Sequence, residues 1–133
     1  MSASGSCLCG EVNFEIDGDF ESFYLCHCQY CQKDTGSTHA SNLFSSVAKL
    51  IWRSGQENIK TYKLPSTKHI RSFCSNCGSA LPSVQMNDKL LVVPAGSLNE
   101  NISIKPNAHI FTASRANWDC ELESIKSYKQ FPQ

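Results

Sequence analysis

The spacing of the cysteines constrains this chain more than any other feature. Seven of its eight cysteines lie in three short clusters, Cys7-Leu8-Cys9, Cys26-His27-Cys28-Gln29-Tyr30-Cys31 and Cys74-Ser75-Asn76-Cys77. Thiols this close in sequence do not readily bond to one another, because a disulfide requires a narrow geometry. A tight turn with cysteines at i and i+2 or i+3 instead directs both sulfurs to one point, which suits tetrahedral zinc. The spacing therefore predicts zinc binding.

Seven thiolate ligands divide naturally into four plus three. Four would enclose one structural zinc, and three would leave a second zinc with an open coordination position. We expect the function to lie at that open position. Iron is a weaker alternative, because the spacings match neither of the common ferredoxin patterns.

Length and charge restrict the class of protein. A chain of 133 residues and 14.8 kDa predicts a single zinc-binding domain over 1–133 with one core. The formal net charge of zero makes nucleic acid an unlikely partner. The first residues lack the pattern of a signal peptide, and no apolar stretch is long enough to span a bilayer. We expect a cytoplasmic protein without membrane contact; the sequence indicates no oligomeric state.

The compartment decides how the cysteines are interpreted. In a reducing compartment they are metal ligands rather than disulfides. A secreted chain would favour the alternative of four disulfides, with Cys120 completing the set. In the intracellular case Cys120 is expected to be a free, partly buried thiol.

Short alternating runs predict a mainly β fold with little helix. Val12, Phe14 and Ile16 alternate with polar residues, which is typical of a half-buried strand. Similar runs occupy residues 42–44, 49–53, 59–64, 68–73 and 109–112. Two further runs, 79–86 and 89–94, predict a hairpin around Asn87-Asp88. We expect residues 32–37 to form a loop, 114–118 a turn or short helix, and 121–129 to be the one helix-compatible segment.

Spacing alone leaves the grouping of the thiols open. Cys28 and Cys31 could join Cys74 and Cys77 as a zinc ribbon. The other division joins Cys7 and Cys9 to Cys74 and Cys77, and leaves Cys26, Cys28 and Cys31 together. We favour this second division, because it gives each cluster a single role and closes a long loop in a small β domain.

Several segments together resemble the glutathione-dependent formaldehyde-activating enzyme family, which includes centromere protein V. They cover about residues 5–118: Gly5 to Val12, the C-H-C-Q-Y-C run with Lys33 and Gly36-Ser37, Arg71 to Ser79, and His109 to Trp118. The resemblance implies a β-tent fold of several short antiparallel sheets. It also implies two zinc ions per chain: a structural one at Cys7, Cys9, Cys74 and Cys77, and a functional one at Cys26, Cys28 and Cys31.

A zinc ion with three thiolates is a weak Lewis acid and favours a soft anionic fourth ligand, such as the sulfur of a substrate thiol. Bound sulfur would be held as the nucleophilic thiolate. The resemblance implies a carbon–sulfur lyase that joins glutathione and formaldehyde as S-(hydroxymethyl)glutathione. Cys26, Cys28 and Cys31 are the expected catalytic ligands. Alternatives are a non-catalytic thiol carrier, and a zinc scaffold that binds a macromolecule.

A glutathione site needs cations, because glutathione carries net negative charge. Lys33, Arg71 and Arg115 are the candidate contacts, together with Lys68. We expect His27 to pack behind the ligands rather than bind metal. His39, His69 and His109 are interpreted as ordinary strand residues, and Trp52 and Trp118 as core residues.

Overall fold

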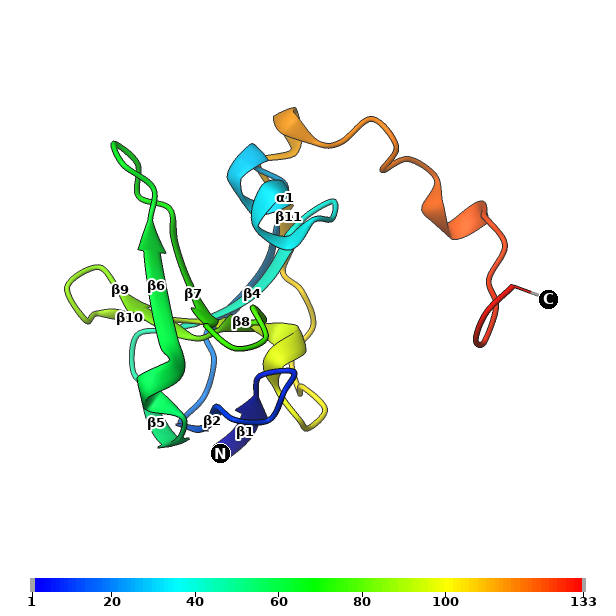
Figure 1. Cartoon of the computed structure of the whole chain (residues 1–133). Helices are drawn as coiled ribbons and strands as arrows, with labels where there is room; N and C mark the ends of the chain where they lie inside the picture. The colour runs from blue at the N-terminus through cyan, green and yellow to red at the C-terminus, as the bar shows by residue number, and fades with distance from the viewer. Residues whose placement is uncertain (1, 133) are drawn as a thin grey trace.

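The computed structural model describes residues 2–132, and within this range the chain forms three small β-sheets and one short α-helix (Figure 1). The first sheet is antiparallel and has the order β1 (Ser2–Ser6), β2 (Asn13–Asp17), β5 (Lys49–Ser54). The third is also antiparallel and has the order β6 (Ile59–Lys63), β7 (Ile70–Cys74), β8 (Ala80–Leu81).

The second sheet joins strands that are far apart in sequence. Its order is β11 (Ala108–Ile110), β3 (Ser22–Cys26), β4 (Ala40–Ser45), β10 (Leu90–Pro94), β9 (Ser83–Gln85). Pairing is antiparallel except for β11, which lies parallel to β3. The resemblance implied antiparallel sheets only. The parallel edge forms because Asn107 meets Phe23, donating its N–H to the Phe23 carbonyl and accepting the Phe23 N–H on its side chain. The prediction of a mainly β fold is confirmed.

The hydrophobic core follows the alternation of β2. Val12, Phe14 and Ile16 are 0%, 1% and 0% exposed. Trp52 packs edge-on against Phe14 with 5.8 Å between ring centroids, so its interpretation as a core residue is confirmed. Trp118 is 57% exposed, and the expectation that it is a core residue is wrong.

The predicted hairpin around Asn87-Asp88 is confirmed. Strands β9 and β10 pair with Leu90 opposite Gln85. Met86, Asn87 and Asp88 all have positive φ, and asparagine and aspartate tolerate this region better than most residues do.

The predicted loop over residues 32–37 is wrong in its first part, because α1 (Gln29–Thr35) extends through it. The Cys28 sulfur accepts the Cys31 N–H at 3.3 Å and caps the start of the helix. Gly36 ends it with φ 69°, and its N–H donates to the Gln32 carbonyl. A glycine suits this left-handed C-terminal position.

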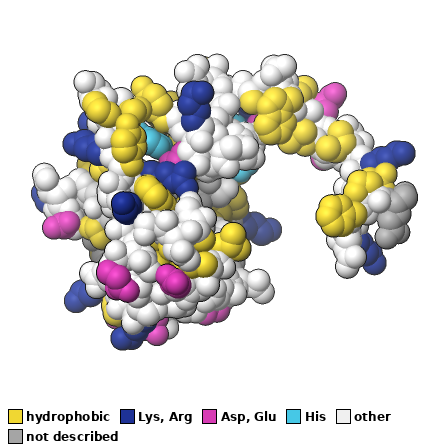
Figure 2. Space-filling view, viewed as in Figure 1, with side chains coloured by type: hydrophobic (Ala, Val, Ile, Leu, Met, Phe, Trp, Pro, Cys, Tyr) yellow, Lys and Arg dark blue, Asp and Glu magenta, His cyan; other side chains and the backbone are white. Residues whose placement is uncertain are grey.

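The remaining helical segments are single turns of 3-10 helix. They are η1 (Gln56–Asn58), η2 (Ala95–Ser97), η3 (Thr112–Ser114) and η4 (Leu122–Ser124). Within the helix-compatible segment 121–129 only η4 forms. Residues 120–132 are exposed and lead away from the sheets (Figure 1), and hydrophobic side chains lie along them (Figure 2). A short helix without a packing partner is only marginally stable. In residues 2–132 no helix is long and apolar enough to cross a membrane.

Candidate metal centre

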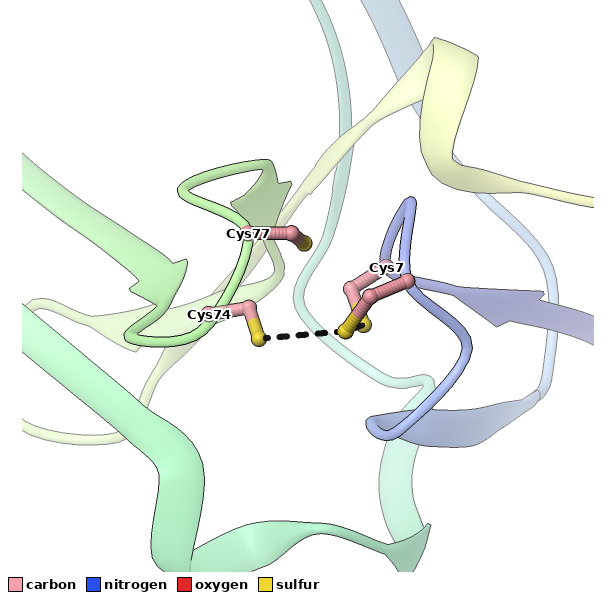
Figure 3. Close-up of side chains that lie close together, drawn as sticks. Cys7, Cys74 and Cys77 are labelled. Atoms are coloured by element: carbon pink, nitrogen blue, oxygen red, sulfur yellow. Dashed lines mark hydrogen bonds between the residues drawn. The ribbon is translucent and has the colours of Figure 1, made fainter.

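Four cysteines from two distant turns converge on one point. Cys7 and Cys9 lie in the turn after β1, and Cys74 and Cys77 lie at the turn between β7 and β8 (Figure 3). Their four sulfurs lie within 4.8 Å of one another, with 3.5 Å from Cys7 to Cys9 and 3.9 Å from Cys9 to Cys74. Zinc–sulfur bonds of about 2.3 Å at tetrahedral angles place sulfurs about 3.8 Å apart. The cluster therefore fits a closed zinc site, which we call the closed cluster.

Hydrogen bonds favour the thiolate form that metals bind at Cys7 and Cys77 of the closed cluster. At Cys74 the backbone hydrogen bond from Cys77 lowers the pKa, but burial and the neighbouring thiols outweigh it and raise the pKa to about 11. The Ser79 hydroxyl and N–H, followed by the Cys9 N–H, lower the pKa of the Cys77 thiol to about 5. The Val12 N–H donates to the Cys7 sulfur at 3.2 Å. The Ser79 hydroxyl also accepts the Leu8 N–H at 3.0 Å, so one serine links both turns.

The other three clustered cysteines form a second group, which we call the knuckle cluster. Cys26 ends β3, Cys28 caps α1, and Cys31 lies in the first turn of α1. Their sulfurs also lie within 4.8 Å of one another. Burial raises the pKa of the Cys31 and Cys26 thiols, and crowding by neighbouring thiols adds to this effect. Three thiolates here need a cation to balance their charge, so the donor set also fits a soft metal ion such as zinc.

The structure groups the cysteines as four plus three and does not assemble the zinc ribbon of Cys28, Cys31, Cys74 and Cys77. All eight cysteines, which lie within residues 2–132, are free thiols. Cys120 is a free thiol as expected, but it is exposed rather than partly buried, so the expected burial is wrong.

A cavity of about 480 Å³ lies against the knuckle cluster. Cys26, Cys28 and Cys31 all form part of its wall. The remaining lining residues come from α1, β4, the turn before β7, β7 to β10, the end of β11 and the residue after it. The closed cluster does not line this cavity. The three-cysteine group is thus the one with space for a ligand beside it.

Two of the four candidate cations line the cavity. They are Lys68 and Arg71, whereas Lys33 and Arg115 are not among its lining residues. Lys33 is exposed near the end of α1. Arg115 lies 3.7 Å from the Asp119 carboxylate. A role of Lys33 or Arg115 in binding glutathione stays a prediction.

His27 lies between Cys26 and Cys28 in the sequence and is fully buried. Its Nε2 lies 2.8 Å from His109 Nδ1, and its Nδ1 lies 3.4 Å from Asp119 Oδ2. Its ring also contacts the His39 ring, with 5.1 Å between centroids. Burial lowers the pKa of His27, so the neutral ring is favoured. His27 packs among histidines and is not part of the three-sulfur group.

Sequence reasoning does not single out several residues of the cavity wall, among them His69 and Asp34. For each of these two residues, its sequence spacing from a predicted site residue indicates a place on the same wall. His69 lies two residues before Arg71, so both share one side of the run 68–73. Asp34 lies three residues after Cys31, and residues three apart on a helix share a face. The prediction of a loop over residues 32–37 does not include this helical relation.

The fold and the cysteine groups define a class: small, mainly β proteins with two cysteine clusters suited to metal ions. Within this class the chain belongs to the glutathione-dependent formaldehyde-activating enzyme family, whose model matches residues 2–114. This confirms the resemblance seen in the sequence. Membership indicates an activity related to glutathione and formaldehyde.

Solved structures agree on the fold. A crystal structure of a Rhodobacter sphaeroides protein, a Northeast Structural Genomics target, is similar with a TM-score of 0.60 and 19% identity. The similarity covers 80% of this chain and 98% of that chain. At this identity the likeness concerns the fold alone. No curated protein matches the chain in sequence.

Proposed function

We propose that this protein is a carbon–sulfur lyase that joins a small thiol, glutathione or a close analogue, to formaldehyde or a related small aldehyde. The observation that carries the proposal is the opening of the three-cysteine group onto a cavity of about 480 Å³. Membership of the family supports the thiol and the aldehyde. The product would be a hemithioacetal such as S-(hydroxymethyl)glutathione.

Cys26, Cys28 and Cys31 would hold the functional zinc ion. Bound there, zinc supplies a position at which the sulfur of the incoming thiol is held as the nucleophilic thiolate. The three cysteines orient that position toward the cavity, whose wall they share. Cys7, Cys9, Cys74 and Cys77 would hold a structural zinc away from the cavity.

The cavity wall is mostly apolar, but some of its groups suit a polar, charged substrate. Lys68 contributes a cation, and Ser41, Asn42, Ser83 and Gln85 contribute uncharged polar groups. These groups suit the carboxylates and peptide bonds of a glutathione-like thiol. The Arg71 guanidinium is already paired with Asp34 at 3.0 Å, which leaves less of its charge for a substrate.

The test combines zinc content, thiol binding and catalysis. We expect the wild type to contain two zinc ions per chain, one for each cluster. Cys26→Ser should retain one zinc, lose glutathione binding in a calorimetric titration, and lose any acceleration over the spontaneous reaction. Cys120→Ser is the matched control, because Cys120 lies outside both clusters.

A wild type that binds glutathione without accelerating the approach to equilibrium would be a thiol carrier. A Cys26→Ser variant with full zinc content and full turnover would contradict the assignment of the knuckle cluster as the functional site.

A further inference from the structure

A histidine–aspartate pair lies on the cavity wall, outside both cysteine clusters. His69 and Asp34 line the same cavity as the knuckle cluster. His69 Nε2 lies 2.9 Å from Asp34 Oδ2, and the two side chains are only 20% and 16% exposed. The pair is therefore held in one geometry and has access to the cavity.

Asp34 is fixed from a second side. Arg71 Nη1 lies 3.0 Å from Asp34 Oδ1 and donates to the Asp34 carbonyl at 2.8 Å. Arg71 Nη2 donates to the Gly78 carbonyl at 2.9 Å. The guanidinium thus ties α1 to the β7–β8 turn and orients the carboxylate toward His69.

His69 is held by its backbone and its ring. Its N–H donates to the Thr67 hydroxyl at 3.1 Å, and its carbonyl accepts the Leu64 N–H at 3.0 Å. The ring contacts the Tyr30 ring, with 5.7 Å between centroids. Among the described residues, His69 is the one histidine that lines this cavity.

The contact with Asp34 sets which ring nitrogen carries the proton. An ionised carboxylate only accepts hydrogen bonds, so His69 Nε2 must donate. In the neutral ring Nδ1 then carries a lone pair, and Nδ1 has no hydrogen-bond partner among residues 2–132. In hydrolases an aspartate likewise holds a histidine in one tautomer and leaves the other ring nitrogen free to act as the base.

The proposed reaction needs such a group. When a thiolate adds to an aldehyde, a sulfur electron pair forms the carbon–sulfur bond and the carbonyl π pair moves to oxygen, which must take up a proton. The incoming thiol must also lose a proton before it adds. If one imidazole accepts the proton of the thiol and delivers it to the carbonyl oxygen, the addition neither consumes nor releases a proton overall.

We propose that His69 is a catalytic general acid–base of this site, with Asp34 as its positioning residue; the inference rests on the proposed function. His69 Nδ1 accepts the thiol proton and donates it to the aldehyde oxygen as the carbon–sulfur bond forms. In the reverse direction Nδ1 takes the hydroxyl proton, the carbonyl re-forms and the electron pair returns to sulfur. The substrate is a thiol with a small aldehyde, or their hemithioacetal.

The test compares His69→Gln and Asp34→Asn with the wild type, all loaded with zinc. Glutamine retains a side-chain amide near Asp34 but cannot carry the proton. We expect His69→Gln to keep its zinc content and glutathione affinity within about twofold and to lose about 100-fold or more in turnover. Added imidazole should restore part of that turnover, which a merely structural role would not allow.

His39→Gln is the matched control, because His39 does not line the cavity. It should keep turnover within about threefold. Nitrogen NMR of the histidine side chains gives a readout besides activity. The wild type should show His69 protonated at Nε2 when neutral, and Asp34→Asn should alter this preference.

The outcomes distinguish a failure of the catalytic role of His69 from a failure of the proposed lyase function. Loss of glutathione binding or zinc in His69→Gln, or full turnover in that variant, overturns the catalytic role while the lyase function stands. A neutral His69 protonated at Nδ1 also overturns it. A wild type without any acceleration overturns the proposed function, and the role of His69 with it.

Discussion

Single residues at this site serve both the fold and the chemistry. Cys28 is the clearest case, because its sulfur belongs to the knuckle cluster and also accepts the Cys31 N–H that starts α1. A helix N-terminus leaves N–H groups without partners, and a capping side chain satisfies one of them. The two roles can be separated by the choice of substitution.

Cys28→Ser and Cys28→Ala should therefore differ in stability but not in metal loss. Both remove one of the three sulfurs, so both should lose the knuckle zinc and the activity. Serine is a good N-cap and alanine is a poor one, so Cys28→Ala should be about 1 kcal/mol less stable than Cys28→Ser. Urea denaturation at equal zinc content measures the difference. Equal stability of the two variants would contradict the capping role.

Among the secondary-structure elements, the strands were the easiest to predict from sequence. The alternation of Val12, Phe14 and Ile16 identifies β2 because one face of that strand is buried. Helix α1 was missed because its seven residues are too few to show a helical period, and its cap is a cysteine rather than serine or aspartate. The parallel pairing of β11 depends on contacts with β3 across about 80 residues, which no local pattern encodes.

The metal ligands of the candidate site could be predicted from the sequence, whereas most residues that line its cavity could not. The cysteines of the two clusters are identifiable from spacing; spacing alone leaves their grouping open, and the resemblance agrees with the division that the roles of the clusters favour. The cavity depends on which elements pack together, so Lys33 could not be distinguished from Arg71 beforehand. Asp119 was missed because its role depends on a tertiary contact with His27.

The C-terminal segment should divide into a part that the fold needs and a part that it does not need. The family match ends at residue 114, but Asp119 lies beyond it, and its buried Oδ2 atom is 3.4 Å from His27 Nδ1. Residues 120–132 are exposed. A chain ending at Cys120 should keep its free energy of unfolding within about 0.5 kcal/mol of the full chain. A chain ending at Ser114 should lose about 1–3 kcal/mol, because it lacks the Asp119 side chain that lies against the buried His27 ring.

Chemical denaturation of the two truncated chains tests this division, with the chain ending at Cys120 as the control for the other. Equal stability of both would show that Asp119 contributes nothing through His27. A large loss in the longer chain would show that the exposed segment packs in solution.

For the whole molecule, the two cysteine groups constrain the chain on different scales. The closed cluster joins Cys9 to Cys74, which are 65 residues apart, and so links the first and third sheets. The knuckle cluster joins cysteines within one six-residue run at the end of β3 and the start of α1. Metal in the closed cluster therefore restricts the unfolded chain far more than metal in the knuckle cluster does.

Removal of metal should accordingly proceed in two stages. A structural zinc contributes about 10–16 kcal/mol of apparent binding free energy. The net stability of a domain is about 5–15 kcal/mol, so loss of zinc from the closed cluster should unfold this one. Loss of the knuckle zinc should leave the sheets intact, because their core lies elsewhere. Chelator titration, with released zinc and near-ultraviolet circular dichroism recorded together, should show one zinc leaving before the signal changes and the second leaving as it collapses.

Two variants assign the stages to the clusters. Cys26→Ser should lack the early stage and keep the late one, because its knuckle cluster is already incomplete. Cys74→Ser should be unfolded or strongly destabilised even with excess zinc, because Cys74 is fully buried within the closed cluster and the core. If the wild type released both metals with its circular dichroism unchanged, the closed cluster would not be what holds the first and third sheets together. The fold would then depend on its apolar core alone, and the two metals would have to be explained by function.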